Sequence, residues 1–435
     1  MSLKQLHLNL FSYGVGHHQA AWRHRSSAAE RLGTLDYHIE LAQLAERGLF
    51  DAVFFADGQS LDPRRAAESP SWFFEPLTLL TALSQHTRRI GLISTVSSSF
   101  YSPFHAARLL ASLQQLSGGR VGVNVVTSMF DSEAQNHSMS ALPEHAQRYA
   151  RADEFIRVLS ELWASWPMES LQVDREGHFM DPSGARAIAH RGEHFAVNGP
   201  LNVPVSHEYG PPVIFQAGAS EPGREMAARY AEGIYAVAAD HQMGVEYASD
   251  LRRRSSRYDR DPQGPLIMPG LVCYVGRSMG EAHTKKRALD QLLPVEQGLR
   301  QLALFTQQDV SDWDLDEPVP PLPPLADFTG PKGRYATILR LIEMHRPTVR
   351  ELLGFLAAGG GHCTMIGTPQ SIADEIELWL DTGAADGFNL MPPSLPEGLR
   401  DFVDLVVPEL QRRGRFRTGY QGSTLRSHLA QGYGR

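Results

Sequence analysis

The stretch RIGLISTVSSSFYSPFHAARLLASLQQLSGGRVGVNVVTS, residues 89–128, contains a strand, a helix and a second strand in succession. Residues 89–98 and 120–128 are apolar runs that end in hydroxyl side chains, which is typical of strands buried on both faces. Residues 103–119 carry apolar side chains at helical spacing, and Gly118-Gly119 ends the helix. Two strands joined by a helix are the unit of a parallel α/β sheet.

The same alternation extends in both directions from this unit. Apolar runs predict further strands, and periodic segments predict helices between them. Polar residues gather where the strands end, as in barrel enzymes. We therefore predict one domain, residues 1–435: an α/β protein with a (β/α)8 TIM barrel and insertions, the longest in the C-terminal half. The further strands are expected at 6–14, 49–57, 211–220, 233–239 and 266–276, and the further helices at 36–47, 76–87, 148–166, 223–231 and 251–258. Residues 364–392 are expected to form a helix between two short strands.

Two segments differ in composition from the rest of the chain. Residues 309–328 are rich in acids and prolines, which predicts an irregular excursion and suggests a lid. Residues 411–435 form a basic C-terminal tail, with arginines at 412, 413, 415, 417, 426 and 435 and no acid after Glu409. We interpret this tail as solvated or subunit-docking, with a role in an anionic-ligand or partner site as the alternative.

Composition excludes several classes of protein. The chain has 435 residues, 42% hydrophobic and 21% charged, with a net charge of −8, which argues against disorder and against a general nucleic-acid surface. Two cysteines form no disulfide framework, and no apolar run approaches a membrane span. There is no basic region followed by an apolar stretch at the start. We expect a soluble cytoplasmic protein.

Candidate ligand residues follow the strands. Asp57 ends the second strand, Thr95 lies near the end of the third, and Asn124 lies in the fourth. A carboxylate, a hydroxyl and an amide there can hydrogen-bond a ligand at the barrel mouth, although each is also common in caps and solvated turns.

A second group suits a phosphate. QAGAS, residues 216–220, leads from a strand through small residues into a helix, so backbone N–H groups lie beside the Ser220 hydroxyl. His145 and Tyr149 are four residues apart on a predicted helix and share a face. There is no GxxxxGK[ST], no GxGxxG after a strand and no GxSxG, so nucleotide-loop, Rossmann and serine-hydrolase sites have no support.

Histidines follow the first strand in GVGHHQAAWRH, which includes His17, His18 and His24. A metal hydrolase needs further ligands at later strand ends, and those ends offer hydroxyls and amides instead. We therefore predict no metal site.

Several stretches together match a known pattern: GHHQAAWRH, DAVFFADG, the block around residues 89–128, VIFQAGASEPGREMAA and DGFNLMPP. They occur in order over nearly the whole chain. In these stretches the chain resembles the bacterial-luciferase-like flavin monooxygenases. Within that family it resembles the branch of nitrilotriacetate monooxygenase component A, pristinamycin IIA synthase and dibenzothiophene-sulfone monooxygenase.

The resemblance implies a TIM-barrel monooxygenase that receives reduced FMN from a separate NAD(P)H:flavin reductase. The flavin would react with O2 to a C4a-(hydro)peroxyflavin and oxygenate a small organic substrate in a shielded pocket. A homodimer or homotetramer is typical of such enzymes. By position, the flavin contacts fall on Asp57, Thr95, Asn124, His145, Tyr149 and Ser220. Catalytic contacts to substrate or peroxide are assigned to His17, His18 and Trp22.

Alternatives remain open at this point. One is an oxidoreductase that uses deazaflavin F420, and another is a flavin-binding protein without turnover. The class of substrate is also open. A polycarboxylate needs cationic side chains at the barrel mouth, whereas a sulfone or thioether needs an apolar mouth. Candidates for such cations are Arg23, Arg25, Arg64 and Arg65. The loop 136–143, NHSMSALP, departs from the family pattern, which predicts an altered substrate entrance.

Overall fold

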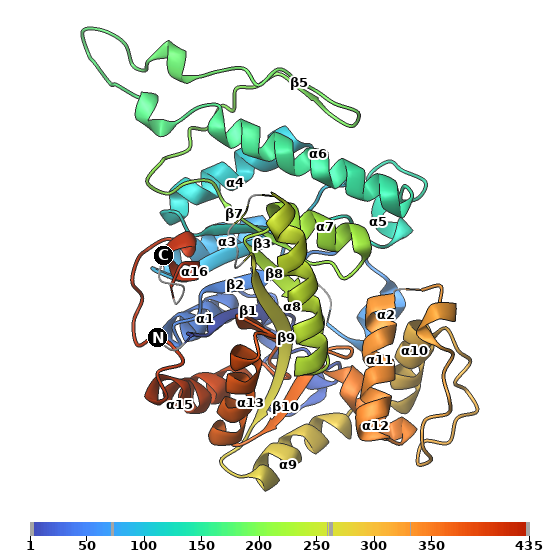
Figure 1. Ribbon diagram of the computed structural model, residues 1–435. Helices are drawn as coiled ribbons and strands as arrows, with labels where there is room; N and C mark the ends of the chain where they lie inside the picture. Colours follow the sequence, from blue (N-terminus) through green and yellow to red (C-terminus); the bar gives the residue numbers. More distant parts are fainter. Residues whose placement is uncertain (1–3, 71–73, 259, 261–263, 331, 432–435) are drawn as a thin grey trace.

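The computed structural model describes residues 4–70, 74–258, 260, 264–330 and 332–431. Eight parallel strands close into a barrel in the order β1-β2-β3-β4-β7-β8-β9-β11, and β11 pairs with β1 to complete the ring (Figure 1). This confirms the predicted (β/α)8 fold. The strands are β1 (His7–Ser12), β2 (Ala52–Phe55), β3 (Gly91–Ser97), β4 (Val121–Val126), β7 (Val213–Gln216), β8 (Gly233–Ala236), β9 (Leu266–Val275) and β11 (Gly387–Leu390).

Helices cover the outside of the barrel, and their ends follow local sequence signals. In α4 (Pro103–Ser117) the Ser102 hydroxyl accepts a hydrogen bond from the His105 N–H at 3.3 Å. Gly118 ends the helix with a φ of 68°, a left-handed conformation that favours glycine. Across the described residues, no helix is long and apolar enough to span a membrane. The other covering helices include α1 (Leu35–Arg47), α3 (Pro76–His86), α6 (His145–Ala164), α7 (Glu221–Tyr230), α8 (His241–Ser255) and α13 (Pro369–Asp381).

Strand β9 is longer than its neighbours and changes partner along its length. Gly270 and Leu271 pair with β11, and residues from Leu271 onward pair with β10 (Cys363–Gly367), which lies outside the ring. The chain between β9 and β10 is the long C-terminal insertion that the sequence predicted. It contains α9 (Met279–Asp290), α10 (Val295–Thr306), α11 (Lys332–His345) and α12 (Val349–Ala357).

Smaller insertions follow β2 and β4. After β2 the chain forms α2 (Pro63–Glu68). Between β4 and β7 it forms α5 (Asp131–Gln135) and, beyond α6, an antiparallel pair of short strands, β5 (His190–Arg191) and β6 (Ala196–Val197). Figure 1 shows this pair extending away from the barrel over α6.

The Pro-rich segment 309–328 is mostly irregular, as its composition predicted, and it is anchored on the insertion. Val310 and Phe328 are buried. Tyr335 of α11 donates a hydrogen bond to the Pro323 carbonyl at 2.7 Å, and Arg350 of α12 pairs with Asp316 at 2.9 Å. The segment therefore packs against α11 and α12, and its role as a lid stays a prediction.

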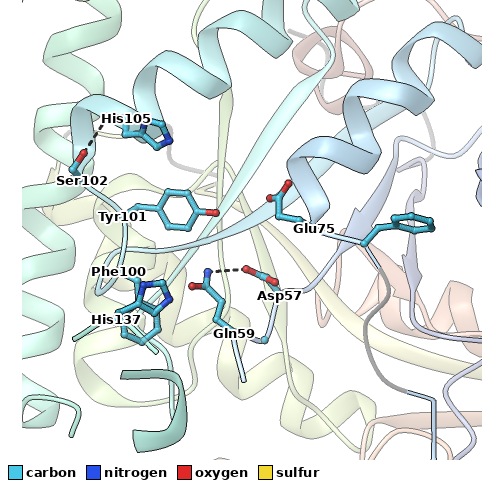
Figure 2. A pocket seen from close by; sticks show the side chains of 10 residues that line it. Asp57, Gln59, Glu75, Phe100, Tyr101, Ser102, His105 and His137 are labelled. Carbon is cyan, nitrogen blue, oxygen red and sulfur yellow. Dashed lines mark hydrogen bonds between the residues drawn. The ribbon is translucent and has the colours of Figure 1, made fainter. Parts of the chain in front are cut away.

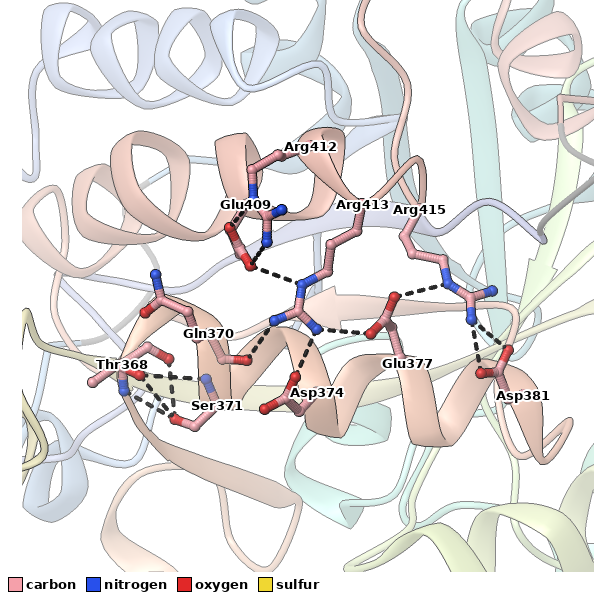
Figure 3. Close-up of polar contacts among 10 residues, drawn as sticks. All are labelled: Thr368, Gln370, Ser371, Asp374, Glu377, Asp381, Glu409, Arg412, Arg413 and Arg415. Carbon is pink, nitrogen blue, oxygen red and sulfur yellow. Dashed lines mark hydrogen bonds and ion pairs between the residues drawn. The ribbon is translucent and has the colours of Figure 1, made fainter.

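The interpretation of the C-terminal residues as a solvated tail is wrong for the part that the structure describes. Arg413 bonds carboxylates of α13, and Arg415 pairs with Glu377 and Asp381 of the same helix at 3.0 and 2.7 Å (Figure 3). Arg417 is buried against Asp51 at 2.5 Å. Arg435 lies outside the described residues. Apart from Glu409, which also pairs with Arg413, the acids that neutralise these arginines are distant in sequence, so the charge pattern alone did not reveal them.

The tail also closes the amino end of the barrel. Helix α16 (Leu425–Leu429) places Leu425 and Leu429 in one buried cluster with barrel side chains such as Phe54, Ile93 and Phe215. A Cβ built on Gly91, the first residue of β3, would lie 2.6 Å from a methyl carbon of Leu425. Because this end is filled, the open end for a ligand is the carboxyl one, as in other barrels.

Candidate active site

Aromatic side chains form a layer near the carboxyl ends of three barrel strands. Phe11 of β1 packs on Phe54 of β2, with ring centroids 5.0 Å apart, and on Tyr235 of β8 at 5.2 Å. His17 lies against Phe11 at 5.0 Å. Phe11, His17 and Tyr235 are half-buried, so solvent reaches this layer from the barrel mouth. The layer therefore presents an apolar surface at the barrel mouth, with the polar ring of His17 beside it.

Thr95 and Asn124 come together on neighbouring strands. They are paired in register on β3 and β4, and the Asn124 amide donates a hydrogen bond to the Thr95 hydroxyl at 3.1 Å. The Asn124 Oδ1 atom is buried and has no hydrogen-bond partner within the described residues. A buried acceptor of this kind requires a donor, and a ligand N–H can supply it.

The predicted phosphate seat is assembled from two helices. Ser220 caps the N-terminus of α7 and accepts the Gly223 N–H at 3.3 Å, and its hydroxyl lies 3.4 Å from the Tyr149 hydroxyl of α6. A Cβ built on Gly223 would lie 3.0 Å from the Tyr149 oxygen, so glycine there leaves room between the two hydroxyls. The ring of the exposed His145 lies tilted beside that of Tyr149, with centroids 4.8 Å apart. The structure thus brings together all three residues proposed for this end of the ligand.

Asp57 lies in a pocket of about 540 Å³ beyond β2 and β3, which Thr95 and Asn124 do not line (Figure 2). Its carboxylate accepts a hydrogen bond from the Gln59 amide at 2.8 Å. Burial raises the pKa of Asp57, and the nearby carboxylates of Glu75 and Glu133 raise it further. A proton is therefore held on this carboxyl more readily than on an exposed aspartate.

Sequence reasoning missed most of the walls of this pocket. His137 stacks on Phe100 with centroids 4.3 Å apart and an interplanar angle of 8°. Tyr101 and Glu75 also line the pocket. The only signal was the departure from the family pattern at residues 136–143, which pointed to this loop without selecting His137.

The three residues proposed as catalytic lie in different surroundings. The His17 ring bonds the Phe11 carbonyl at 2.9 Å, and burial lowers its pKa to about 4, so it is neutral at pH 7. His18 is buried, accepts the Ala20 N–H on Nδ1 at 3.1 Å and bonds Asp290 through Nε2 at 3.2 Å. Trp22 donates its indole N–H to the Glu68 carbonyl at 3.0 Å. Only His17 contacts the aromatic layer, and the roles of all three stay predictions.

His362, at the start of β10, is a further polar residue of the layer that the sequence did not single out. Its Nε2 atom shares a hydrogen bond with the Tyr235 hydroxyl at 3.1 Å. Burial lowers the pKa of His362 to about 3, and burial also raises the pKa of Tyr235 above its usual value. Both groups are neutral at physiological pH. Its only sequence signal is a histidine after three glycines, Gly359 to Gly361.

Histidine, cysteine and carboxylate side chains do not gather into a metal site: no group of three or more is found among the described residues.

Comparison with known proteins defines the class of this barrel. Residues 11–386 match the model of the luciferase-like monooxygenase family. The chain belongs to this family and is a monooxygenase.

Individual relatives match over almost the whole chain. N-acetyl-S-(2-succino)cysteine monooxygenase of Bacillus subtilis is 41% identical over 98% of this chain and 96% of its own length. Nitrilotriacetate monooxygenase component A of Aminobacter aminovorans is 40% identical with the same coverages. The crystal structure of DmoA from Hyphomicrobium sulfonivorans superposes with a TM-score of 0.87 at 32% identity, over 98% of this chain and 92% of that one. An F420-dependent secondary alcohol dehydrogenase, at 16% identity and a TM-score of 0.58 over 92% and 98%, shares only the fold.

Proposed function

We propose that this protein is an FMNH2-dependent monooxygenase of the two-component type that oxygenates a small organic molecule with O2. The observation that carries the proposal is the pair of hydroxyls of Ser220 and Tyr149 at the N-terminus of α7, on the same carboxyl end of the barrel as the Asn124 oxygen that has no partner within the described residues. An FMN-dependent relative, FMNH(2)-dependent dimethylsulfone monooxygenase, matches part of the chain at 30% identity.

The residues present fit FMN at both of its ends. Ser220, Tyr149 and the first N–H groups of α7 would hold the phosphate, because a helix N-terminus and hydroxyl donors favour an anion. Asn124 Oδ1 would accept an N–H of the flavin ring, which satisfies a buried acceptor that otherwise lacks a partner. When bound, reduced flavin supplies the electrons and activates O2.

The protein then has two tasks, to orient the reactants and to exclude water. Phe11 and Tyr235, backed by the buried Phe54, give an apolar surface for the substrate. His17 and His362 stay neutral there, so neither donates a proton readily to a reactive oxygen species. Their neutrality means that neither histidine adds charge to the layer. Asp57 belongs to the neighbouring pocket, and its proposed flavin contact requires the ligand to extend towards that pocket.

The proposal includes a separate NAD(P)H:flavin reductase as the source of reduced FMN and a homodimer or homotetramer as the working form. The segment 309–328 would cover the mouth as a lid. Limited proteolysis of this segment with and without FMN tests the lid, since protection by the flavin is expected and unchanged cleavage would contradict it. The substrate is an organic molecule; the compounds that appear in the relatives' names include N-acetyl-S-(2-succino)cysteine and nitrilotriacetate.

The experiment that tests the function mixes the protein anaerobically with reduced FMN and candidate thioether or amine substrates and then adds ¹⁸O2. Incorporation of one ¹⁸O atom into product, dependent on the protein, is expected. The matched variant Ser220→Ala should retain the fold and require more FMN for the same rate. Reduction or oxidation of F420 without oxygen uptake, or flavin binding without labelled product from any substrate, would contradict the proposal.

A further inference from the structure

One arginine at the open end of the barrel makes few polar contacts within the described residues. Arg334 lies in the first turn of α11 and is half-buried. Its guanidinium donates a hydrogen bond to the Gly360 carbonyl and lies over the Phe305 ring, 4.9 Å from the centroid. Its contacts within the described residues include no carboxylate, and burial lowers its pKa. Arg334 is therefore a cation in a partly dry site without a counter-ion.

Two other arginines, Arg120 and Arg340, make more hydrogen bonds or ion pairs than Arg334 does. Arg120 is also buried without an acid, and it makes five hydrogen bonds to backbone and hydroxyl oxygens, including those of Ser84 and Thr87. Arg340, on the same helix as Arg334, pairs with Asp240 at 2.6 Å and with Glu343 at 2.8 Å. Arg334 has five N–H donors and, among the residues that the structure describes, one hydrogen-bonded acceptor, so most of its donors remain available for a ligand.

The position of Arg334 connects the two ends of the candidate active site. A Cβ built on its neighbour Gly333 would lie 3.0 Å from the Cβ of Ala219, so α11 begins against the turn that precedes Ser220. Its guanidinium bonds the carbonyl of Gly360, two residues before His362, and the His362 ring in turn bonds the Tyr235 hydroxyl of the aromatic layer at 3.1 Å. The groups it faces there are neutral at pH 7, so nothing in this layer neutralises it.

We propose that Arg334 binds a carboxylate of the substrate, so that this monooxygenase acts on an organic anion rather than on a neutral alkane, sulfide or sulfone. The inference rests on the proposed function and adds the substrate class to it. A guanidinium matches a carboxylate in two parallel hydrogen bonds, and such pairs are strong where water is scarce. The aromatic layer of Phe11, Phe54 and Tyr235 would receive the uncharged part of the molecule.

Direct binding to the flavin-free protein provides the test. The probes are thiodiglycolate, a thioether with two carboxylates, and its uncharged dimethyl ester, titrated by calorimetry. The native protein should bind the acid at least tenfold more tightly than the ester. Arg334→Gln should weaken binding of the acid by about 10- to 100-fold and leave the ester unchanged. Arg334→Lys keeps the charge but lacks the planar guanidinium, so its affinity for the acid should lie between those of the native protein and Arg334→Gln.

Arg340→Gln is the matched control on the same helix, and it should not change the affinity for thiodiglycolate. Equal binding of acid and ester, or equal binding of the acid to native protein and Arg334→Gln, would overturn the proposal. Titration with FMN and riboflavin, each in its oxidised and reduced form, tests whether Arg334 binds the flavin phosphate instead of a substrate carboxylate. If Arg334→Gln weakens flavin binding instead, the guanidinium serves the cofactor and the proposal is wrong. Binding of the acid through Arg334 without ¹⁸O incorporation would contradict the monooxygenase proposal alone.

Discussion

Replacing Asp51 by asparagine should destabilise the protein strongly, although no ligand is near this residue. Asp51 precedes β2 and is fully buried. It accepts the Leu8 N–H at 2.7 Å, pairs with Arg417 at 2.5 Å and contacts the His7 ring at 3.2 Å. The positive charge of Arg417, together with His7, holds the pKa of Asp51 well below its usual range, even though burial opposes ionisation.

The substitution Asp51→Asn keeps the shape and removes the charge, so Arg417 is left buried without a counter-ion. Breaking a buried pair in this way costs about 3–5 kcal/mol, because the remaining ion loses its compensation for desolvation. The free energy of unfolding at pH 7 from urea titration, followed by fluorescence and circular dichroism, measures the loss. The double variant Asp51→Asn/Arg417→Met removes both charges and should lose less than Asp51→Asn alone.

An exposed ion pair serves as the control. Asp316 and Arg350 are paired at 2.9 Å on the surface, and Asp316→Asn should give an unfolding curve that overlays that of the native protein. The reasoning would be refuted if Asp51→Asn cost less than about 1 kcal/mol, or if the double variant were less stable than Asp51→Asn. Either result would mean that the tail is held by packing and not by the buried ion pair.

Three further predictions follow from the site and the tail. Ser220→Ala should weaken binding of FMN by about tenfold in a fluorescence titration and leave riboflavin unaffected, since a hydroxyl bond to a charged phosphate is lost; equal losses for both flavins would contradict the phosphate seat. Asp57→Asn should raise the thermal midpoint at pH 7, because burial raises the pKa of Asp57 and its ionised form is unfavourable in the fold, and the gain should shrink as pH falls through that raised pKa; a lowered midpoint at pH 7 would refute this. Burial lowers the pKa of His428 to about 4, so the unfolded chain binds its proton first and native stability should fall by roughly 3 kcal/mol as pH drops from 6.5 to 4. His428→Gln should show a shallower pH dependence over this range in urea titrations, and an identical slope would count against the assignment.

The sequence was sufficient for the barrel because its strands and helices carry local signals. Strands buried on both faces appear as continuous apolar runs, and helices such as α4 carry both a capping serine and a terminating glycine. The grouping of Tyr149 with Ser220 could also be predicted, since each residue lies near a recognisable helix start and the family resemblance assigns both to the flavin site.

Features that depend on partners far away in the chain could not be predicted from the sequence. Arg415 and Arg417 were interpreted as part of a free basic tail because their acids lie on α13 and beside β2, far away in the chain. Arg334 was missed for the opposite reason, since its importance comes from an absent partner, which no sequence pattern displays. The exposed Arg23, Arg25, Arg64 and Arg65 attracted attention instead, although exposure makes them poor anchors for a ligand.

The filled amino end of the barrel sets an order of events during protein synthesis. β1 can close the ring only with β11, more than 370 residues later, and α16 completes the packing beneath them only after a further stretch of chain has left the ribosome. Until then the inner faces of the early strands lack the leucines that cover them, and long-range closures of this kind are slow and prone to aggregation. Expression should therefore be most sensitive to changes in the last part of the chain, and a fusion partner placed there needs a linker long enough to let Leu425 and Leu429 seat first.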